Sequence, residues 1–427
     1  MSWQFLRAAV LAGCCVALAV CPAVKAASED GAPAKAAAVK DTPVEETSEP
    51  SVRYLPLDAP AGTSQAVVVE GHPLVHTRQL LPLDREGKMV GEGSVDKQVE
   101  QVLDNLDAVL SASGSSLERL VRLNVYALAP PTVDCVREQL TRRLEPAVRP
   151  AITAVPTPLP HRDALCAVDA VAVAADKGKA VAFARCDAVA GEEGCADAAV
   201  LPRGGVAYLS GVPAEGGLAM SAVTKSMSTL WELLEELKLS PAQVVQLKVF
   251  LRPASSADEV LRELKEFFPD QMTPPVVFVE WLAPPPVEIE LIAQLPLTDE
   301  SGPSVEYYNP PEVRPMQIFS RVALVRSERQ IYVSGLFARK AGRGQDQALD
   351  VFDQLKAILA ETGSDLRHMA KATYYVCDDD SARGMDRARL WLYDQDRPPA
   401  ASKCMVHGVG QSGRTLSMDM IAVGTGR

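Results

Sequence analysis

Thiols are the groups whose type and spacing first suggest chemistry in this chain. Three of its nine cysteines, Cys14, Cys15 and Cys21, fall in an apolar N-terminal run. None of the other six has a Cys-x-x-Cys or histidine-containing spacing typical of a zinc site, so we expect no metal. Cys186 and Cys195 flank an Ala-Gly-Glu-Glu-Gly turn. We predict a disulfide between these two in an oxidising compartment, and the alternative is a pair of ordinary small hydrophobic residues.

The N-terminus has the pattern of an export signal. Arg7 is its lone charge, residues 8–20 are an apolar run, and cleavage after Ala26 fits the small-residue rule. The run is too short to span a bilayer as a stable helix. Alternatively, residues 11–14 resemble the lipobox of bacterial lipoproteins, with Cys14 as the lipid-bearing residue. In both cases we expect the protein to leave the cytoplasm, as a periplasmic or secreted protein, and to contact a membrane only if Cys14 is lipidated.

Charge and composition narrow the classes of function. A net charge of −12 argues against broad electrostatic binding to nucleic acid, so we expect no nucleic-acid partner. Residues 27–52 are rich in Ala, Pro, Glu, Ser and Lys, which is typical of a disordered linker. Residues 298–315 are rich in Pro and turn formers and predict a second linker.

One unit of helix, turn and strand occurs three times in the chain. Apolar side chains recur at steps of three and four residues, which predicts a helix, and then alternate with polar ones, which predicts a strand. The unit occupies residues 95–128, 226–251 and 350–376. Matching Val121 to Val245 and Ala370 gives a period of about 125 residues, which indicates a domain copied three times and not a short solenoid repeat.

Each copy has the element order β-β-α-β-α-β-β. In the first copy, apolar runs at 65–69 and 74–77 around Glu-Gly-His-Pro predict a hairpin before the helix. A second helix is predicted at 132–144, followed by strands near 152–155 and 165–174. The order predicts an α+β fold in which helices cover one face of a mixed sheet. The other face is also apolar and needs a cover.

Short motifs in all three copies resemble the RidA/YjgF family of reactive imine deaminases, formerly called endoribonuclease L-PSP. They include Gly-Thr-Ser-Gln-Ala-Val, Gly-Ser-Ser-Leu, Tyr-Leu-Ser-Gly, Val-Glu-Ile-Glu, Tyr-Val-Ser-Gly and Arg-Pro-Pro-Ala, at residues 62–67, 114–117, 208–211, 287–290, 332–335 and 397–400. Residues 121–126 and 150–170 of the first copy fit as well. The resemblance covers about residues 55–425, and the repeated order of the motifs carries it.

The resemblance implies a chorismate mutase-like fold and a trimer whose sheets face inward, with ligand pockets between subunits. Three copies on one chain therefore predict a pseudo-trimer folded from one polypeptide, because tethering raises the effective concentration of the partner surfaces. We predict RidA-like domains at residues 53–175, 176–297 and 316–427, and a monomer in solution.

The resemblance also implies where a ligand binds. Active members place an arginine in a Pro-Ala-Arg strand, where its guanidinium grips a substrate carboxylate with two hydrogen bonds. The corresponding residues here are Ile152, Val276 and Ala401, so the arginine is expected to be absent from all three copies. An apolar side chain cannot offset the desolvation of a buried carboxylate.

Three more residues fall at the implied pocket. Thr63 stands at the position of the family's pocket tyrosine, and Arg78 stands where a glycine is expected. Lys403 follows Ala401 by two residues and so lies on the same side of a strand, where it is a looser substitute for the missing arginine. The alternative for Arg78 and Lys403 is an ordinary solvated charge.

Acids in the last strand of each copy match the second acidic position of the family's Glu-Ile-Glu motif. They are Asp169, Glu290 and Asp419. Such an acid works as a general base if burial raises its pKa. The alternative is a structural acid that accepts hydrogen bonds from a neighbouring strand.

Two functions follow. The first is a non-catalytic small-molecule-binding or scaffold protein, with a small metabolite in a cleft between domains. The second is an enamine or imine deaminase-type hydrolase that uses Asp169, Glu290 or Asp419. We expect no cofactor in either case, and the sequence favours the binding protein because all three arginines are absent.

Overall fold

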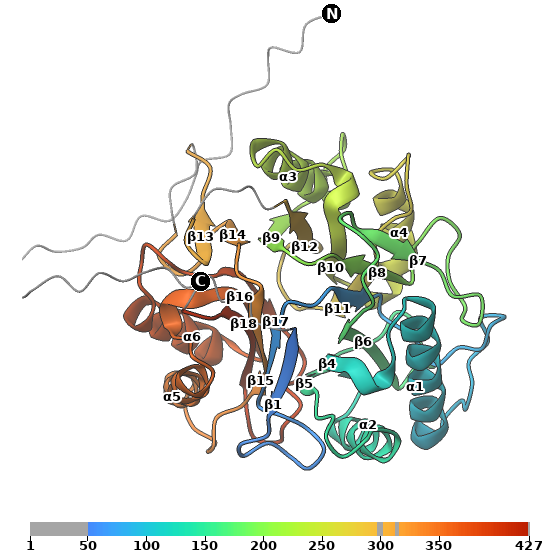
Figure 1. The fold of residues 1–427 in the computed structure, drawn as a ribbon, viewed down its shortest axis with the longest axis horizontal. Coiled ribbons are helices and arrows are strands. Elements are labelled where there is room, and N and C mark those ends of the chain that lie inside the picture. Colours follow the sequence, from blue (N-terminus) through green and yellow to red (C-terminus); the bar gives the residue numbers. More distant parts are fainter. Residues whose placement is uncertain (1–49, 297–301, 312–315, 426–427) are drawn as a thin grey trace, which may run out of the picture. The chain divides into compact units, whose positions relative to one another are not determined.

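The three sequence copies fold into three six-stranded sheets, which we call sheets I, II and III (Figure 1). The computed structural model describes residues 50–296, 302–311 and 316–425. Each sheet has one parallel strand pair, and its other described pairs are antiparallel. Two helices pack against one face of each sheet. The predicted α+β fold of three RidA-like domains is confirmed.

Sheet I has the strand order β5-β4-β6-β3-β8-β7. Ser94 accepts a hydrogen bond from the backbone N–H of Lys97 and so caps the first helix, and Gly114, at φ +79°, follows its end. The elements are β3 (Leu74–Thr77), α1 (Val95–Ala112), β4 (Leu120–Ala127), α2 (Pro130–Arg143), β5 (Ala151–Pro156), β6 (Cys166–Val173), β7 (Ala182–Ala184) and β8 (Ala198–Leu201).

Sheets II and III repeat this order as β11-β10-β12-β9-β14-β13 and β17-β16-β18-β15-β2-β1. Sheet II and its helices comprise β9 (Gly205–Ala214), α3 (Ala222–Glu236), β10 (Val244–Leu251), α4 (Ala257–Lys265), β11 (Val276–Glu280), β12 (Val287–Leu295), β13 (Val305–Tyr308) and β14 (Val322–Val325). Sheet III and its helices comprise β1 (Ser51–Leu55), β2 (Ala66–Glu70), β15 (Arg329–Leu336), α5 (Gly344–Glu361), β16 (Met369–Val376), α6 (Asp379–Leu392), β17 (Ala400–Met405) and β18 (Leu416–Val423).

Each sequence copy gives its first two strands to the sheet of another copy. β7 and β8 join sheet I, β13 and β14 join sheet II, and β1 and β2 join sheet III. In Figure 1 the blue β1 accordingly lies beside the orange and red strands of the C-terminal third. The exchange runs in a circle, so the first strands of the chain complete the last sheet. Sheet boundaries therefore differ from copy boundaries, and β13 falls inside the segment predicted as a linker.

The predicted hairpin of residues 65–77 is wrong. β2 pairs with β1 and β15, whereas β3 pairs with β6 and β8 of sheet I. The two apolar runs and the turn between them are present, and Gly71 has the positive φ of +67° that a tight turn favours. All four residues of β3 and four of the five in β2 are buried, so both strands have neighbours on each side, and the turn carries the chain between sheets.

The inner faces of the three sheets share one core, which supplies the cover that the sequence required. Val67, Tyr208 and Val245 belong to one apolar cluster of this core, together with residues from all three sheets. A second inner cluster contains Tyr126, Phe250 and Tyr375, again one from each sheet. Burial of apolar side chains from three sheets in common clusters stabilises the pseudo-trimeric arrangement.

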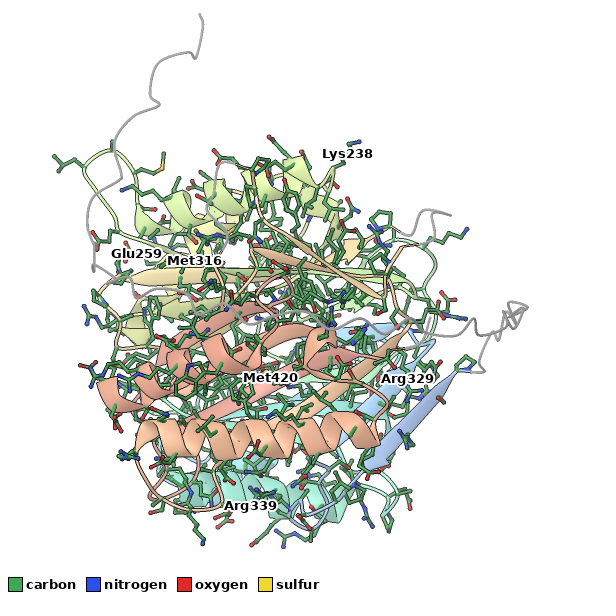
Figure 2. All side chains as sticks on the ribbon, turned by 90° about the vertical axis from the view of Figure 1, so that its left-hand side faces the viewer. Lys238, Glu259, Met316, Arg329, Arg339 and Met420 are labelled. Atoms are coloured by element: carbon green, nitrogen blue, oxygen red, sulfur yellow. The ribbon has the colours of Figure 1, made fainter. Side chains whose placement is uncertain are left out.

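Separate clusters fill the space between each sheet and its helices. In Figure 2 the labelled Met420 of β18 lies well inside the structure, where it packs with α5, whereas Lys238 and Arg339 lie at the periphery. The predicted signal peptide, Cys14 and nearly all of the first linker lie outside the described residues. No helix in the described part of the chain is long and apolar enough to cross a membrane.

Candidate functional site

The three last-strand acids meet in a polar layer between the two inner apolar clusters. Asp169, Glu290 and Asp419 are each at most 3% exposed. They line a central cavity of about 40 Å³ together with Arg122, Lys248 and other residues. The sequence placed these acids on equivalent strands, and the structure brings them together at the centre of the three sheets.

Two of the acids form ion pairs between sheets. The guanidinium of Arg122 on β4 lies 2.5 Å from the carboxylate of Asp419 on β18. The ammonium of Lys371 on β16 lies 2.6 Å from Glu290 on β12. Burial raises the pKa of Asp419, but the charges of Arg122, Lys248 and Lys371 and the hydrogen bond from Arg122 together outweigh burial and hold that pKa below its usual range. A carboxylate held in this way stabilises the assembly of sheets and is a poor proton acceptor.

The third acid is held by hydrogen bonds from its own sheet. Tyr126 Oη donates to Asp169 at 2.6 Å, and Asn124 Nδ2 donates to it at 2.9 Å. Burial raises the pKa of Asp169, although nearby Lys248 and the two hydrogen bonds oppose the shift. All three acids are thus hydrogen-bonded or ion-paired inside the central layer, and Asp169 and Asp419 differ in the direction of their pKa shifts.

His76 of β3 lies in the same layer. Neither ring nitrogen has a hydrogen-bond partner among the described residues, and Gln246 and Arg122 line the cavity beside it. Burial, and then the charge of Arg122, lower the pKa of His76 to about 4. The ring is therefore neutral near pH 7. No group of three or more His, Cys, Asp or Glu in the described ranges is arranged to hold a metal ion.

The three sheets meet at three equivalent junctions, and the ligand positions implied by the sequence fall there. We name them the I–II, II–III and III–I clefts after the sheets that form them. Val276 lies in the first, Ala401 in the second, and Ile152 in the third. The clefts are equivalent in position but differ in side chains, so they must be compared one by one.

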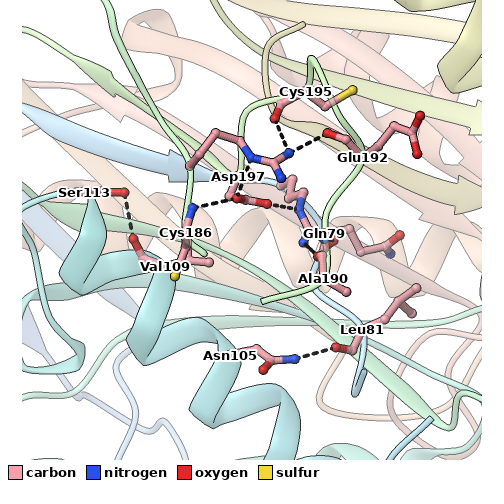
Figure 3. Close-up of polar contacts among 12 residues, drawn as sticks. Gln79, Leu81, Asn105, Val109, Ser113, Cys186, Ala190, Glu192, Cys195 and Asp197 are labelled. Atoms are coloured by element: carbon pink, nitrogen blue, oxygen red, sulfur yellow. Dashed lines mark hydrogen bonds and ion pairs between the residues drawn. The ribbon is translucent and has the colours of Figure 1, made fainter. Parts of the chain in front are cut away.

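The I–II cleft is occupied by an ion pair. The guanidinium of Arg78 lies 2.7 Å from the buried carboxylate of Asp197 and also donates to the carbonyl of Ala190. Asp197 accepts a further bond from the backbone N–H of Cys186, and Figure 3 shows it at the centre of these contacts. The neighbouring Gln79 donates to the carbonyl of Phe278 across the cleft. Arg78 thus serves structure in this cleft, where the family resemblance implied a glycine.

The II–III cleft contains an acid that the sequence interpretation missed. Glu288 of β12 packs against Gly211. A Cβ added to Gly211 would lie 2.0 Å from Glu288 Oε1 and 2.6 Å from Ser402 Oγ. Burial raises the pKa of Glu288 to about 7, and Glu290 adds to the shift while Ser402 opposes it. An acid with this pKa exchanges protons near neutral pH. The signal was present in Val-Glu-Ile-Glu, whose first acid was passed over for the second.

Glu288→Gln is expected to change the pH dependence of stability. A carboxyl whose folded pKa is raised favours the folded state below its unfolded value of 4.5, and this contribution is lost as the pH rises through about 7. The free energy of unfolding of the wild type, minus that of the variant, should therefore fall by roughly 2–3 kcal/mol from pH 4.5 to pH 8. Urea titrations across this range measure the difference. Glu86→Gln, at an exposed site, is the control, and an equal pH dependence for both variants would contradict the burial of a protonated Glu288.

The III–I cleft is open, with a cavity of about 510 Å³. Its lining includes Ile152 and Ala154 of β5, Ser334 and Gly335 of β15, and Thr63. By strand register, the position of Arg78 in the I–II cleft is held here by the small Ser334, which lines the cavity. Two of the residues predicted at a ligand pocket, Thr63 and Ile152, therefore lie together in the III–I cleft. A third, Arg78, lies in the I–II cleft.

The remaining predicted positions make contacts within the protein. Lys403 forms an ion pair of 2.7 Å with Asp386 of α6, so its ammonium faces a helix. Ala401 is buried, and its backbone N–H donates to Ser210. Cys186 and Cys195 are both buried and both are free thiols in this structure, so their pairing stays a prediction.

Comparison with known proteins gives the following matches. A family model described as Endoribonuclease L-PSP matches residues 57–174 and 311–423, more than half of the chain. A RutC family protein of Synechocystis is 32% identical over 117 residues, which are 27% of this chain and 88% of that protein. Protein HMF1 of Saccharomyces cerevisiae is 36% identical over 66 residues, 16% of this chain and 50% of its own, so this chain spans half the length of that relative.

Solved structures from the same group of proteins align with single parts of the chain. A Rid family protein of unknown function from Yersinia pestis aligns with 29% of this chain and 98% of its own, at 26% identity and a TM-score of 0.25. A member of the YjgF family from Neisseria meningitidis aligns with 29% of this chain and 97% of its own, at 21% identity and a TM-score of 0.23. These TM-scores support no conclusion beyond the sequence matches.

Proposed function

Since this chain belongs to the endoribonuclease L-PSP family, we propose that it is a non-catalytic protein that binds a small molecule in the III–I cleft. We further propose that it works as a monomeric pseudo-trimer outside the cytoplasm, after export by its N-terminal signal. Light scattering of the mature protein that gave three times the chain mass would contradict the monomer.

One observation carries the binding proposal. The III–I cavity of about 510 Å³ lies in the size range of ordinary small-molecule sites and is lined by both apolar and polar side chains. The equivalent I–II position is occupied by the ion pair of Arg78 and Asp197. An open cleft beside an occupied equivalent supports a role for the open one in binding.

Two observations favour binding over catalysis. The family resemblance gives the carboxylate-binding arginine the position of Ile152, which lines the open cavity. Asp169 and Asp419, which are the last-strand acids on the two sheets forming this cleft, hold hydrogen bonds and an ion pair in the central layer. Neither Asp169 nor Asp419 is therefore among the described residues that line the open cleft.

We expect no deamination of 2-iminobutyrate above the spontaneous rate. A substrate carboxylate in the III–I cleft would lose its hydration without gaining a cationic partner. Ile152→Arg supplies that partner, and a charge-assisted hydrogen bond of about 1.5–3 kcal/mol should raise the affinity for 2-oxobutyrate at least about tenfold. Ammonia release measures turnover, and calorimetry measures binding.

Ile152→Leu is the matched control, because it keeps the volume and adds no charge. Binding of 2-oxobutyrate by Ile152→Leu as strong as by Ile152→Arg would show that the arginine position was assigned to the wrong residue. Rapid deamination by the unmodified protein would refute the non-catalytic proposal.

A second candidate is a hydrolase that acts in the II–III cleft. Glu288 favours it, because a buried carboxyl with a pKa of about 7 suits general acid–base catalysis. Glu288→Gln should then abolish turnover of imine substrates and leave the folded protein intact. A panel of imines with no turnover by the wild type would remove this candidate.

A further inference from the structure

Two buried hydroxyl groups at the III–I cleft have no hydrogen-bond partner among the described residues. They belong to Ser64, which lines the cavity, and to Ser417 of β18. Ser417 does not line the cavity, but its hydroxyl lies near the lining residue Gly335, where an added Cβ would be 3.5 Å from Ser417 Oγ. Both serines are fully buried. A buried hydroxyl without a partner is unfavourable, which indicates that a ligand or water completes it.

The charges around this cavity do not suit an anion. The charged residues among the described lining are Asp58, Asp134 and Arg137. Arg137 is paired with Asp134 at 2.8 Å, and Asp58 has no ion-pair partner among the described residues. The protein also has a net charge of −12. A carboxylate ligand would therefore approach an acidic rim and find no cation at the floor.

Apolar and neutral polar groups form the rest of the wall. Ile152, Ala154 and Phe337 offer apolar surface, while Gln65 and Ser334 offer neutral donors and acceptors. The glycine-rich loop at 408–413 forms one side and separates this cavity from a neighbouring one of about 500 Å³. The lining thus combines an apolar surface with hydroxyl and amide groups that both donate and accept.

We propose that the III–I cleft selects an uncharged ligand that carries a carboxamide, and that it excludes the corresponding carboxylate. The proposal rests on the proposed function. A hydroxyl donates to an amide carbonyl and accepts from an amide N–H, so Ser64 pairs with such a group without any charge. The apolar wall then receives the hydrocarbon part of the ligand.

Matched pairs of probes test this inference. Benzamide and benzoate, and butyramide and butyrate, differ only in the charged group, and ligand-observed NMR with titration gives their affinities for the full mature chain at pH 7.5. We expect each amide to bind at least about tenfold more tightly than its acid. Ser64→Ala should weaken amide binding about tenfold, the loss of one hydrogen bond, and Ile152→Arg should reverse the preference within each pair.

Ser320→Ala is the matched control. Ser320 holds the equivalent position at the II–III cleft, and its hydroxyl is likewise buried and without a partner among the described residues. Its loss should leave amide binding unchanged. If carboxylates bind the wild type as tightly as amides do, and Ile152→Trp abolishes the binding of both, the proposed ligand class is overturned and the proposed function is kept. Absence of binding by every probe, in the wild type and in Ile152→Arg, would overturn both.

Discussion

Arg122→Met is expected to lower the free energy of unfolding by about 3–5 kcal/mol, because it leaves Asp419 buried without its cation. The two groups are 2.5 Å apart, and the side chains are 6% and 4% exposed. Methionine keeps much of the aliphatic volume, so the loss reports mainly on charge. Because the pair joins sheet I to sheet III, the variant tests whether the polar layer holds the three sheets together.

Urea denaturation of the variant measures the loss. Arg143→Met is the control, because Arg143 pairs with Asp104 at a largely exposed site and should cost less than about 1 kcal/mol. The double variant Arg122→Met with Asp419→Leu should recover part of the loss, because no uncompensated charge then remains. An Arg122→Met protein no less stable than the Arg143→Met control would show that the central ion pair contributes little.

Removal of residues 50–70 is expected to abolish the soluble monomer. β2 pairs with β15 over five residues, and Val67, Val68, Val69 and Leu55 are buried. Each such side chain contributes about 1.5–3 kcal/mol, so their combined loss is comparable to the whole stability of an ordinary domain, about 5–15 kcal/mol. The edge of β15 would also be open to pairing with other chains. Size-exclusion chromatography with light scattering measures the outcome.

A circular permutant is the matched control, since it contains the same residues in another order. Val423 of β18 pairs with Gln330, which pairs with Val69, which pairs with Val52 of β1. Three strand spacings separate Val423 from Val52, about 14 Å. The permutant begins with residues 71–425, continues with a Gly/Ser linker of about eight residues, and ends with residues 50–70. Because the linker can span this distance, the permutant should form a monomer. A soluble, monomeric deletion variant, or a permutant that aggregates, would contradict the closing role of β1 and β2.

Local patterns in the sequence predicted most of the elements and the shared core. The helix of residues 95–112, its Ser94 cap and the strand that begins near Val121 follow from apolar periodicity, which is a local property. The pairing partners of β2 and β3 are not local. Two short buried strands with a turn between them fit a hairpin as well as an exchange, so the sequence pattern did not distinguish these alternatives.

The sequence predicted only part of the site, because contacts between residues far apart in the chain are not local properties of the sequence. Thr63 and Ile152 were expected near a ligand, and they line the open cleft. The contacts of Asp419 with Arg122 were not predictable, because the two residues are far apart in the chain and meet only after three sheets assemble. Which cleft stays open depends on single residues: Arg78 pairs with Asp197 in one cleft, and the equivalent position in the open cleft is the small Ser334.

The circular exchange of strands also affects the order in which the protein is made. β1 and β2 emerge first from the ribosome, yet their partner strand β15 begins at Arg329, after most of the chain has been synthesised. Sheets I and II have all their strands by Val325, whereas sheet III needs both ends of the chain. Long-range pairing of this kind is slow, because the intervening loop must be closed. A ribosome that stops before β15 therefore releases a chain with an unpaired β2 edge, which quality-control proteases and chaperones distinguish from the finished product.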